Sequence, residues 1–174
     1  ILRPHISDLP QLVEIYGHAV LNGTASFELT PPDLAEMTQR FQLLVDNGFP
    51  YFVAKTTEGT VLGYAYAGAY RPRPAYRFTL EDSVYIAPDV QGLGVGRALL
   101  EAIIEDAEDK NYRQMIAVIG DSKHAASIEL HKNLGFEPVG TFKNVGWKQD
   151  RWLDSVLMQR PLGDGAGRPP EPGT

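Results

Sequence analysis

The chain has no cysteine among its 174 residues. This absence excludes disulfide bonds, thiolate metal ligands and a mechanism that uses a cysteine nucleophile. It is also typical of a reducing compartment, so we expect a cytoplasmic protein. Histidine is scarce as well. The four histidines lack metal-ligand spacing such as His-Glu-x-x-His, and no metal site is predicted.

The sequence also has few positively charged residues and no long apolar runs. Sixteen Lys and Arg stand against 22 Asp and Glu, which gives a formal net charge of −6. Nucleic-acid-binding proteins carry a basic surface, so no nucleic-acid partner is expected. No apolar run reaches the roughly 20 residues that a membrane-spanning helix needs, so no membrane segment is predicted. An anionic ligand would have to be held by local donors, because the overall field repels it.

The apolar pattern predicts one mixed α/β domain over residues 1–162, followed by a disordered Gly- and Pro-rich tail over residues 163–174. Helices are expected where apolar residues recur with helical spacing. The first covers residues 8–21 with Ser7 as N-cap, and the second is opened by Pro31 and Pro32. The third covers residues 95–109, and the fourth is capped by Asp121 and Ser122 and runs to Leu134. Strands are expected over residues 51–55, 61–66, 76–79, 83–87, 115–119, 136–142 and 152–158.

A glycine-rich turn, Gln91–Arg97 (Gln-Gly-Leu-Gly-Val-Gly-Arg), lies between a predicted strand and a long predicted helix. Glycines let backbone N–H groups point at a ligand, and the helix start adds partial positive charge, so the turn could cradle a phosphate or pyrophosphate. A purely structural turn remains the alternative. Gly96 is followed by Arg97 and Ala98 and not by Lys-Ser/Thr, which disfavours an NTPase. The spacing Gly-x-Gly-x-Gly also departs from the nicotinamide-enzyme fingerprint.

The stretch from Val84 to Leu100 resembles the acetyl-CoA signature of the GNAT N-acetyltransferase superfamily, whose pattern is Gln/Arg-x-x-Gly-x-Gly/Ala. Gln91, Gly94 and Gly96 match it, and the stretch from His124 to Phe136 matches the second half of that superfamily. The resemblance implies the acyl-CoA N-acyltransferase fold, a central, mostly antiparallel mixed sheet flanked by helices, with acetyl-CoA as co-substrate. It implies these cofactor-binding residues: Val84, Tyr85 and Ile86 beside the pantetheine arm, Gln91, Gly92, Leu93, Gly94, Val95, Gly96 and Arg97 at the pyrophosphate, and His124, where relatives usually have asparagine.

Three further stretches resemble the phosphinothricin and methionine-sulfoximine N-acetyltransferase group within that superfamily: Tyr66-Ala-Gly, Arg71–Tyr85 and Gly146–Asp154. This resemblance implies acetylation of the amino group of a small amino-acid analogue such as phosphinothricin, methionine sulfoximine or methionine sulfone. It also implies a role in detoxification and herbicide resistance. By the same resemblance the protein is a homodimer in which the strand ending at Val118–Gly120 completes the partner's substrate pocket.

Acetyl transfer requires a neutral amine, so a base must remove a proton from the ammonium form. Glu81 is the candidate, because it lies on the strand that leads into the expected thioester site. Strand alternation points Asp82 to the opposite face, so at most one of the two is the base. A solvated carboxylate is the alternative for Glu81. Without cysteine, direct attack in a ternary complex is the simpler mechanism.

Arg71 and Arg73 are separated by one residue and would share a face of an extended segment, where two guanidinium groups suit an anionic group of the acceptor. Ordinary surface arginines in a loop with Pro72 and Pro74 are the alternative. The remaining predicted substrate-binding residues are Tyr66, Tyr76, Glu81, Asp82, Ser83, Val118 and Gly120.

His131 lies three residues after Ile128, on the inner face of its predicted helix. One interpretation is a satisfied core histidine. The other is a catalytic or substrate-orienting group, because many superfamily members have at this position a tyrosine that protonates the leaving thiolate, and imidazole can donate a proton near neutral pH. Two other functions also remain open: acetylation of a protein N-terminus or lysine, which predicts an open acidic groove, and a non-catalytic acetyl-CoA-binding module.

Overall fold

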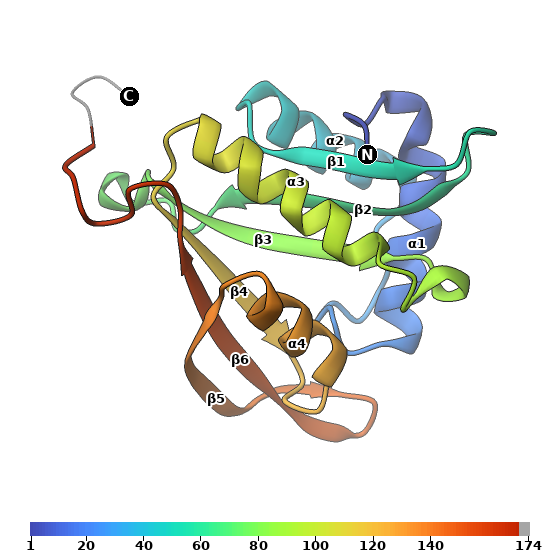
Figure 1. Ribbon diagram of the computed structural model, residues 1–174. Helices are drawn as coiled ribbons and strands as arrows, with labels where there is room; N and C mark the ends of the chain where they lie inside the picture. Colours follow the sequence, from blue (N-terminus) through green and yellow to red (C-terminus); the bar gives the residue numbers. More distant parts are fainter. Residues whose placement is uncertain (171–174) are drawn as a thin grey trace.

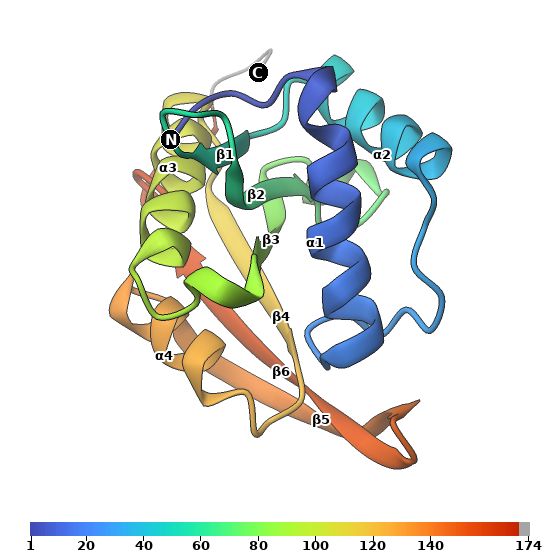
Figure 2. The same cartoon turned by 90° about the vertical axis from the view of Figure 1, so that its right-hand side faces the viewer.

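The computed structural model describes residues 1–170. A six-stranded sheet lies between two layers of helices (Figures 1 and 2). The strands are β1 (Tyr51–Lys55), β2 (Val61–Ala69), β3 (Thr79–Ile86), β4 (Gln114–Gly120), β5 (Glu137–Lys148) and β6 (Arg151–Pro161). Their order across the sheet is β1-β2-β3-β4-β6-β5, with β3 and β4 parallel and the other neighbours antiparallel. The predicted mixed α/β architecture is confirmed.

Helices α1 (Leu9–Asn22) and α2 (Leu34–Asp46) cover one face of the sheet, and α3 (Val95–Asp109) and α4 (Ala125–Asn133) cover the other (Figure 2). Each layer has its own buried apolar cluster. The α3 side includes Leu99, Ile103 and Met115, and the α1–α2 side includes Leu12 and Phe41. Burial of these side chains provides most of the favourable folding free energy.

Three helix starts differ from the sequence prediction. Ser7 lies inside a 3-10 turn, η1 (Ile6–Asp8), and Asp8 is the residue that precedes α1. Asp33, and not Pro31 or Pro32, caps α2, where its carboxylate accepts a hydrogen bond from the N–H of Glu36 at 2.8 Å. The third difference, at the start of α4, concerns the functional site and is described with it.

The expected strand over residues 76–79 is wrong for its first residues. Pro74–Tyr76 forms a 3-10 turn, η2, with a proline at its first position, and β3 begins at Thr79. Because proline fixes φ near the helical value, it favours this turn over an extended segment. Arg71 and Arg73 lie in an irregular loop between β2 and β3 and not in a strand, although Arg73 itself has extended backbone angles.

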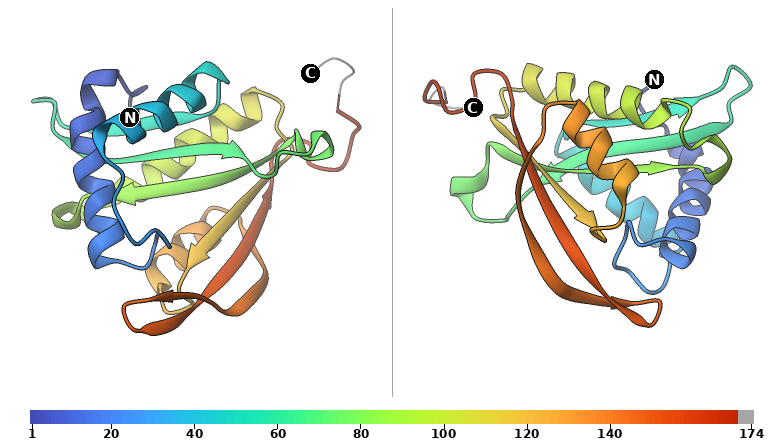
Figure 3. Two further views of the ribbon diagram at one scale, coloured as in Figure 1. Left: turned by 180° about the vertical axis from the view of Figure 1, so that it is seen from behind. Right: turned by 60° about the horizontal axis from the view of Figure 1, so that its bottom comes forward.

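The sheet divides between its two parallel strands. β3 and β4 are paired over only three positions, from Thr79–Gln114 to Glu81–Ile116. Beyond them β3 continues beside β2 and β4 continues beside β6, so the two strands diverge (Figures 1 and 3). We call this region, residues 82–86 of β3 and 117–120 of β4, the fork. Its facing edges carry backbone N–H and C=O groups that can pair with an extended ligand.

The chain beyond β6 forms consecutive turns. The N–H of Gly165 donates to the carbonyl oxygen of Leu162 at 2.8 Å, and the N–H of Gly167 to that of Asp164 at the same distance. Residues 171–174 of the predicted tail lie outside the described part of the chain, and disorder over residues 163–174 stays a prediction. Among residues 1–170, no helix is long and apolar enough to cross a membrane.

Candidate active site

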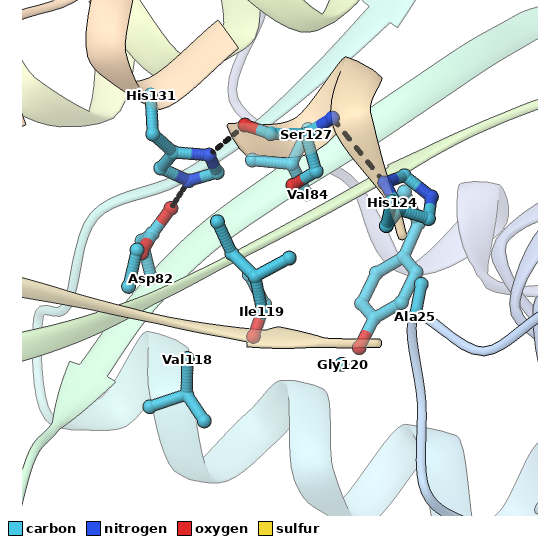
Figure 4. Close-up of a pocket in the computed structure, with 12 residues that line it drawn as sticks. Ala25, Asp82, Val84, Val118, Ile119, Gly120, His124, Ser127 and His131 are labelled. Atoms are coloured by element: carbon cyan, nitrogen blue, oxygen red, sulfur yellow. Dashed lines mark hydrogen bonds and ion pairs between the residues drawn. The ribbon is translucent and has the colours of Figure 1, made fainter. Parts of the chain in front are cut away.

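A pocket opens in the fork, between the diverging strands and helix α4 (Figure 4). It brings together eight of the predicted site residues: Asp82, Ser83, Val84, Tyr85, Val118, Gly120, His124 and His131. Four further lining residues carried no signal in the sequence: Ala25, Ala117, Ile119 and Ser127. We call this the fork pocket.

His131 and Asp82 form a buried pair on the wall of the fork pocket (Figure 4). Nε2 of His131 lies 2.8 Å from Oδ2 of Asp82, and Nδ1 lies 2.7 Å from the carbonyl oxygen of Ser127. Burial alone would lower the pKa of His131, but the Asp82 carboxylate and the Ser127 carbonyl outweigh it, so the net pKa is raised. His131 is thus both a fully hydrogen-bonded buried histidine and a pocket residue that favours its protonated form.

The first turn of α4 orients both pocket histidines. The N–H of Ser127 donates to Nδ1 of His124 at 3.2 Å, so His124 is the N-cap of α4, and the prediction that Asp121 and Ser122 cap it is wrong. Asp121 has φ of +71° and accepts a hydrogen bond from the N–H of Lys123, which places it before the helix. Because Nδ1 of His124 accepts, its proton lies on Nε2, which remains free to donate to a ligand.

The loop between α1 and α2 closes one side of the fork pocket through Ala25. Nζ of Lys148 donates to the carbonyl oxygen of Ser26 at 2.6 Å, and the Phe27 ring contacts two glycines that would not admit a side chain. A Cβ atom at Gly120 would lie 2.8 Å from the ring, and one at Gly146 would lie 2.5 Å from it. These contacts fix the loop against the ends of β4 and β5.

The glycine-rich turn lies between β3 and α3. Gly92 and Gly94 have φ of +79° and +83°, a left-handed conformation that favours glycine, and a Cβ atom at either would meet no other atom within 4 Å. Gly94 is the N-cap of α3 and provides no side-chain cap, so the N–H groups of Val95, Gly96 and Arg97 are available to an anion. Gln91 and Leu93 are exposed, and Arg97 pairs with Glu101.

Glu81 lies on the face of β3 opposite Asp82, as strand alternation predicts. Asp82 contacts His131 on α4. Tyr85, which is four residues after Glu81 and on the same face of the strand, packs against the α1–α2 cluster. Burial raises the pKa of Glu81, the charge of Asp82 raises it further, and Arg71 partly offsets both. A half-buried carboxyl with a raised pKa is suited to accept a proton near neutral pH.

The other predicted acceptor residues lie outside the fork pocket. Tyr66 on β2 is paired with Ser83 and lines a second, smaller aromatic pocket on the α1–α2 side. Arg71 places its guanidinium over the Tyr70 ring at 5.1 Å, and Tyr76 contacts the same ring edge-on. Arg73 and Tyr76 are exposed. Within this group, Arg71 is the residue whose charge lowers the pKa of Glu81.

A protein-family model described as an acetyltransferase (GNAT) domain matches residues 1–157. The chain belongs to this GNAT family. It is 56% identical over 164 residues to a phosphinothricin N-acetyltransferase of Alcaligenes faecalis, covering 94% of this chain and 83% of the relative. It is 45% identical over 154 residues to an L-methionine sulfoximine/L-methionine sulfone acetyltransferase of Pseudomonas paraeruginosa, covering 88% and 89%.

A solved structure shares the whole architecture of this GNAT domain. A phosphinothricin acetyltransferase from Sinorhizobium meliloti, crystallised with acetyl-CoA, has a TM-score of 0.97 and 48% identity over 99% of this chain and 93% of that chain. The protein is therefore an acetyl-CoA-dependent N-acetyltransferase. Among residues 1–170 no group of three or more His, Asp or Glu side chains is arranged to hold a metal ion.

Proposed function

We propose that the protein transfers the acetyl group of acetyl-CoA to the amino group of a small amino-acid analogue such as phosphinothricin, methionine sulfoximine or methionine sulfone, by direct attack in a ternary complex. The observation that carries the proposal is Glu81: a half-buried carboxyl with a raised pKa at the point where β3 and β4 separate. The names of the relatives at 56% and 45% identity support the substrate class. A role in detoxification and herbicide resistance, and a cytoplasmic location, go with this proposal.

The donor is proposed to lie along the fork. The pyrophosphate would be held by the N–H groups of residues 92–97, because Gly92, Gly94 and Gly96 leave three positions of this turn without a side chain. The pantetheine amides would pair with the open edge of Val84–Ile86, and a strand N–H there would polarise the thioester carbonyl. Nε2–H of His124 supplies a donor at the other wall of the pocket.

The acceptor is proposed to approach from the face that carries Glu81. Glu81 removes a proton from the ammonium group, directly or through a water, and the neutral amine attacks the thioester carbon. Arg71 and Arg73 hold the anionic end of the acceptor, with Tyr66 and Tyr76 as hydroxyl donors. Ser83, Val118 and Gly120 line the fork pocket and are proposed to contact the acceptor.

A thiol-release assay tests the proposal. Purified protein is supplied with acetyl-CoA and a panel of methionine sulfone, methionine sulfoximine, phosphinothricin, lysine and an alanine-starting peptide, and the products are identified by mass spectrometry. Turnover of the amino-acid analogues is expected. Turnover of the peptide alone would replace the substrate class with a protein N-terminus, and acetyl-CoA binding without turnover of any amine would leave a binding module.

Glu81→Gln tests the proposed base. We expect kcat to fall by about 10² to 10⁴, the usual contribution of a general base, while the Kd for acetyl-CoA is retained. Glu58→Gln, in the exposed turn between β1 and β2, is the matched control and should leave kcat unchanged. Unchanged activity of Glu81→Gln would remove Glu81 from this role.

A homodimer is the second part of the proposal, and the outer strand of the sheet supports it. β5 is an edge strand whose residues are exposed from Glu137 to Val145, and it carries large apolar side chains on its surface. With β6 it exposes more than half of the area of each of five side chains: Val139, Phe142, Val145, Trp147 and Trp152. The two tryptophan rings contact each other edge-on at 5.2 Å. A large exposed apolar surface of this kind marks an interaction site.

Sedimentation of the purified protein tests the homodimer. Trp147→Glu should convert a dimer to a monomer, whereas Leu43→Glu, which changes an even more exposed apolar residue on α2, should not. A monomer before any substitution would refute the homodimer. If the dimer forms and Trp147→Glu leaves it intact, the β5 surface is not its interface. Activity recovered on mixing variants at Val118 and Glu81 would support a pocket shared between protomers.

A further inference from the structure

The pair formed by His131 and Asp82 holds one proton that can move. Nδ1 of His131 faces a carbonyl oxygen, which only accepts, so Nδ1 carries a hydrogen. Nε2 and Oδ2 of Asp82 are 2.8 Å apart and share a single hydrogen between them, either as imidazolium with carboxylate or as neutral imidazole with carboxylic acid. Losing that hydrogen would leave two facing lone pairs in a buried site, which is unfavourable.

Asp82 depends on His131 for its hydrogen bonding. Its second oxygen, Oδ1, is buried and has no hydrogen-bond partner among the described residues, and the side chain is almost completely buried. A buried carboxylate with one partner is poorly stabilised, so it strongly favours a proton on that partner. Both residues line the fork pocket, where the ligand would be in reach of the proton they share.

We infer that Asp82 and His131 act as one proton-sharing unit that supplies the proton for the departing CoA sulfur, with Asp82 as the positioning residue that keeps His131 protonated. This inference rests on the proposed function. As the amine nitrogen forms its bond to the acetyl carbon, the C–S bond breaks and its electron pair goes to sulfur. The hydrogen held between Nε2 and Oδ2 moves to that sulfur, giving the CoA thiol. The ammonium group gives one proton to Glu81 before the attack, and the nitrogen loses a second proton as the amide forms. One of these two protons leaves to solvent, and the other, passed through solvent, restores the hydrogen of the unit.

Few other groups influence this proton. Tyr85 and His124 are the other titratable residues that line the fork pocket. Glu81 precedes Asp82 on the opposite face of β3, and Lys132 and Glu129 on α4 are exposed. The Phe136 ring packs edge-on against the His131 ring at 5.0 Å and adds no charge. Burial opposes the protonated form of His131, and among the charged groups Asp82 is the one that offsets burial and raises the pKa of His131.

Asp82→Asn tests the inference through the pH profile of kcat. The variant keeps the shape of the side chain but removes the charge that favours protonated His131. We expect kcat at neutral pH to fall on the order of 10²-fold, and the alkaline limb, where the acid is lost, to move to lower pH by about 1 to 3 pH units. Asp8→Asn is the matched control. Asp8 is also a buried aspartate in an ion pair, with Lys55, and its substitution should leave the alkaline limb in place.

A change of leaving group separates proton supply from a structural role. An acetyl ester of a thiophenol releases a thiolate that needs no proton near neutral pH, so Asp82→Asn and His131→Asn should lose no more than about twofold with this donor. Glu81→Gln should stay impaired with both donors. The double variant Asp82→Asn/His131→Asn should be no slower than the worse single variant, because the two residues act as a unit.

The outcomes distinguish the inference from the proposed function. An alkaline limb that does not move, or a deficit of Asp82→Asn that is equally large with the thiophenol ester, overturns the proton-sharing unit. Absence of turnover of the amino-acid analogues by the unsubstituted protein overturns the proposed substrate instead. In that case acetyl-CoA and the thiophenol ester are compared with the panel peptide or water as acceptor. The titration of His131, followed by NMR, must still move to lower pH in Asp82→Asn.

Discussion

Gly146→Ala would place a methyl group against the Phe27 ring, which holds the α1–α2 loop beside the fork pocket. The new Cβ atom would lie 2.5 Å from Cε2 and 2.8 Å from Cδ2 of the ring. Carbon atoms in contact are normally about 3.5 Å apart, so the ring must retreat by about 1 Å. Its opposite edge already faces Gly120, where a Cβ atom would be 2.8 Å from Cε1, so there is little space to retreat into.

The size of the effect follows from these contacts. Overpacking of this kind costs about 1 to 3 kcal/mol, and replacing glycine where φ is not positive returns about 0.4 to 1 kcal/mol through the unfolded chain. We expect a net loss of about 0.5 to 2 kcal/mol in the free energy of unfolding. Because the displaced loop carries Ala25, kcat/KM should fall about 10- to 100-fold, the usual result of a misplacement of about 1 Å near reacting groups.

Urea unfolding and acetyl-transfer kinetics check both numbers. Gly140→Ala is the matched control, since Gly140 also lies on β5 and a Cβ atom there would have no neighbour within 4 Å. It should be as stable as the unsubstituted protein or slightly more stable. In a Phe27→Ala background Gly146→Ala should cost nothing further. An equal penalty for Gly146→Ala with and without the Phe27 ring would refute the reasoning.

Two further changes address the glycine turn and acid stability. Gly94→Ala forces a side chain into φ of +83° at the N-cap of α3, so the free energy of unfolding should fall by about 1 kcal/mol and the KM for acetyl-CoA should rise. Gly140→Ala is again the control. An unchanged KM would contradict donor binding at this turn. Hydrogen bonds from Lys143, Ser122 and the N–H of Asn144 lower the pKa of Asp154 to about 2. A carboxylate whose pKa is lowered by folding stabilises the fold fully above its ordinary pKa of about 4, and this stabilisation is lost as the pH falls toward about 2. Asp154→Asn should therefore destabilise the protein at about pH 7 and much less at about pH 2.5. Urea unfolding at the two pH values checks this, and a pH-independent penalty would argue against it.

Local patterns in the sequence predicted the parts of the site that depend on local geometry. Alternation along a strand placed Glu81 and Asp82 on opposite faces, and helical spacing placed His131 inside. The glycines of residues 92–96 correctly indicated a turn between a strand and a helix. The assignment of individual residues to donor or acceptor stays a prediction.

Contacts between distant segments could not be predicted. The Lys148 ammonium bonds the carbonyl oxygen of Ser26, 122 residues away, and nothing local to either residue indicates this. Gly146 resembles an ordinary strand glycine in the sequence, and only the folded chain brings Phe27 against it. The sequence assigns His124 to the donor alone, because its use as a helix cap depends on where α4 begins, and helix boundaries are weakly encoded.

The fork has a consequence for how this protein avoids unwanted association. An unpaired strand edge normally recruits strands from other molecules, and most sheets have such edges only at their rims. Here two unpaired edges lie within the sheet, in a gap walled by α4 on one side and the α1–α2 loop on another. A strand of another folded protein would bring its side chains and its neighbouring strands into this walled gap, whereas a thin, flexible chain with amides brings neither. The fork therefore favours narrow chains over protein strands as hydrogen-bonding partners for its two unpaired edges.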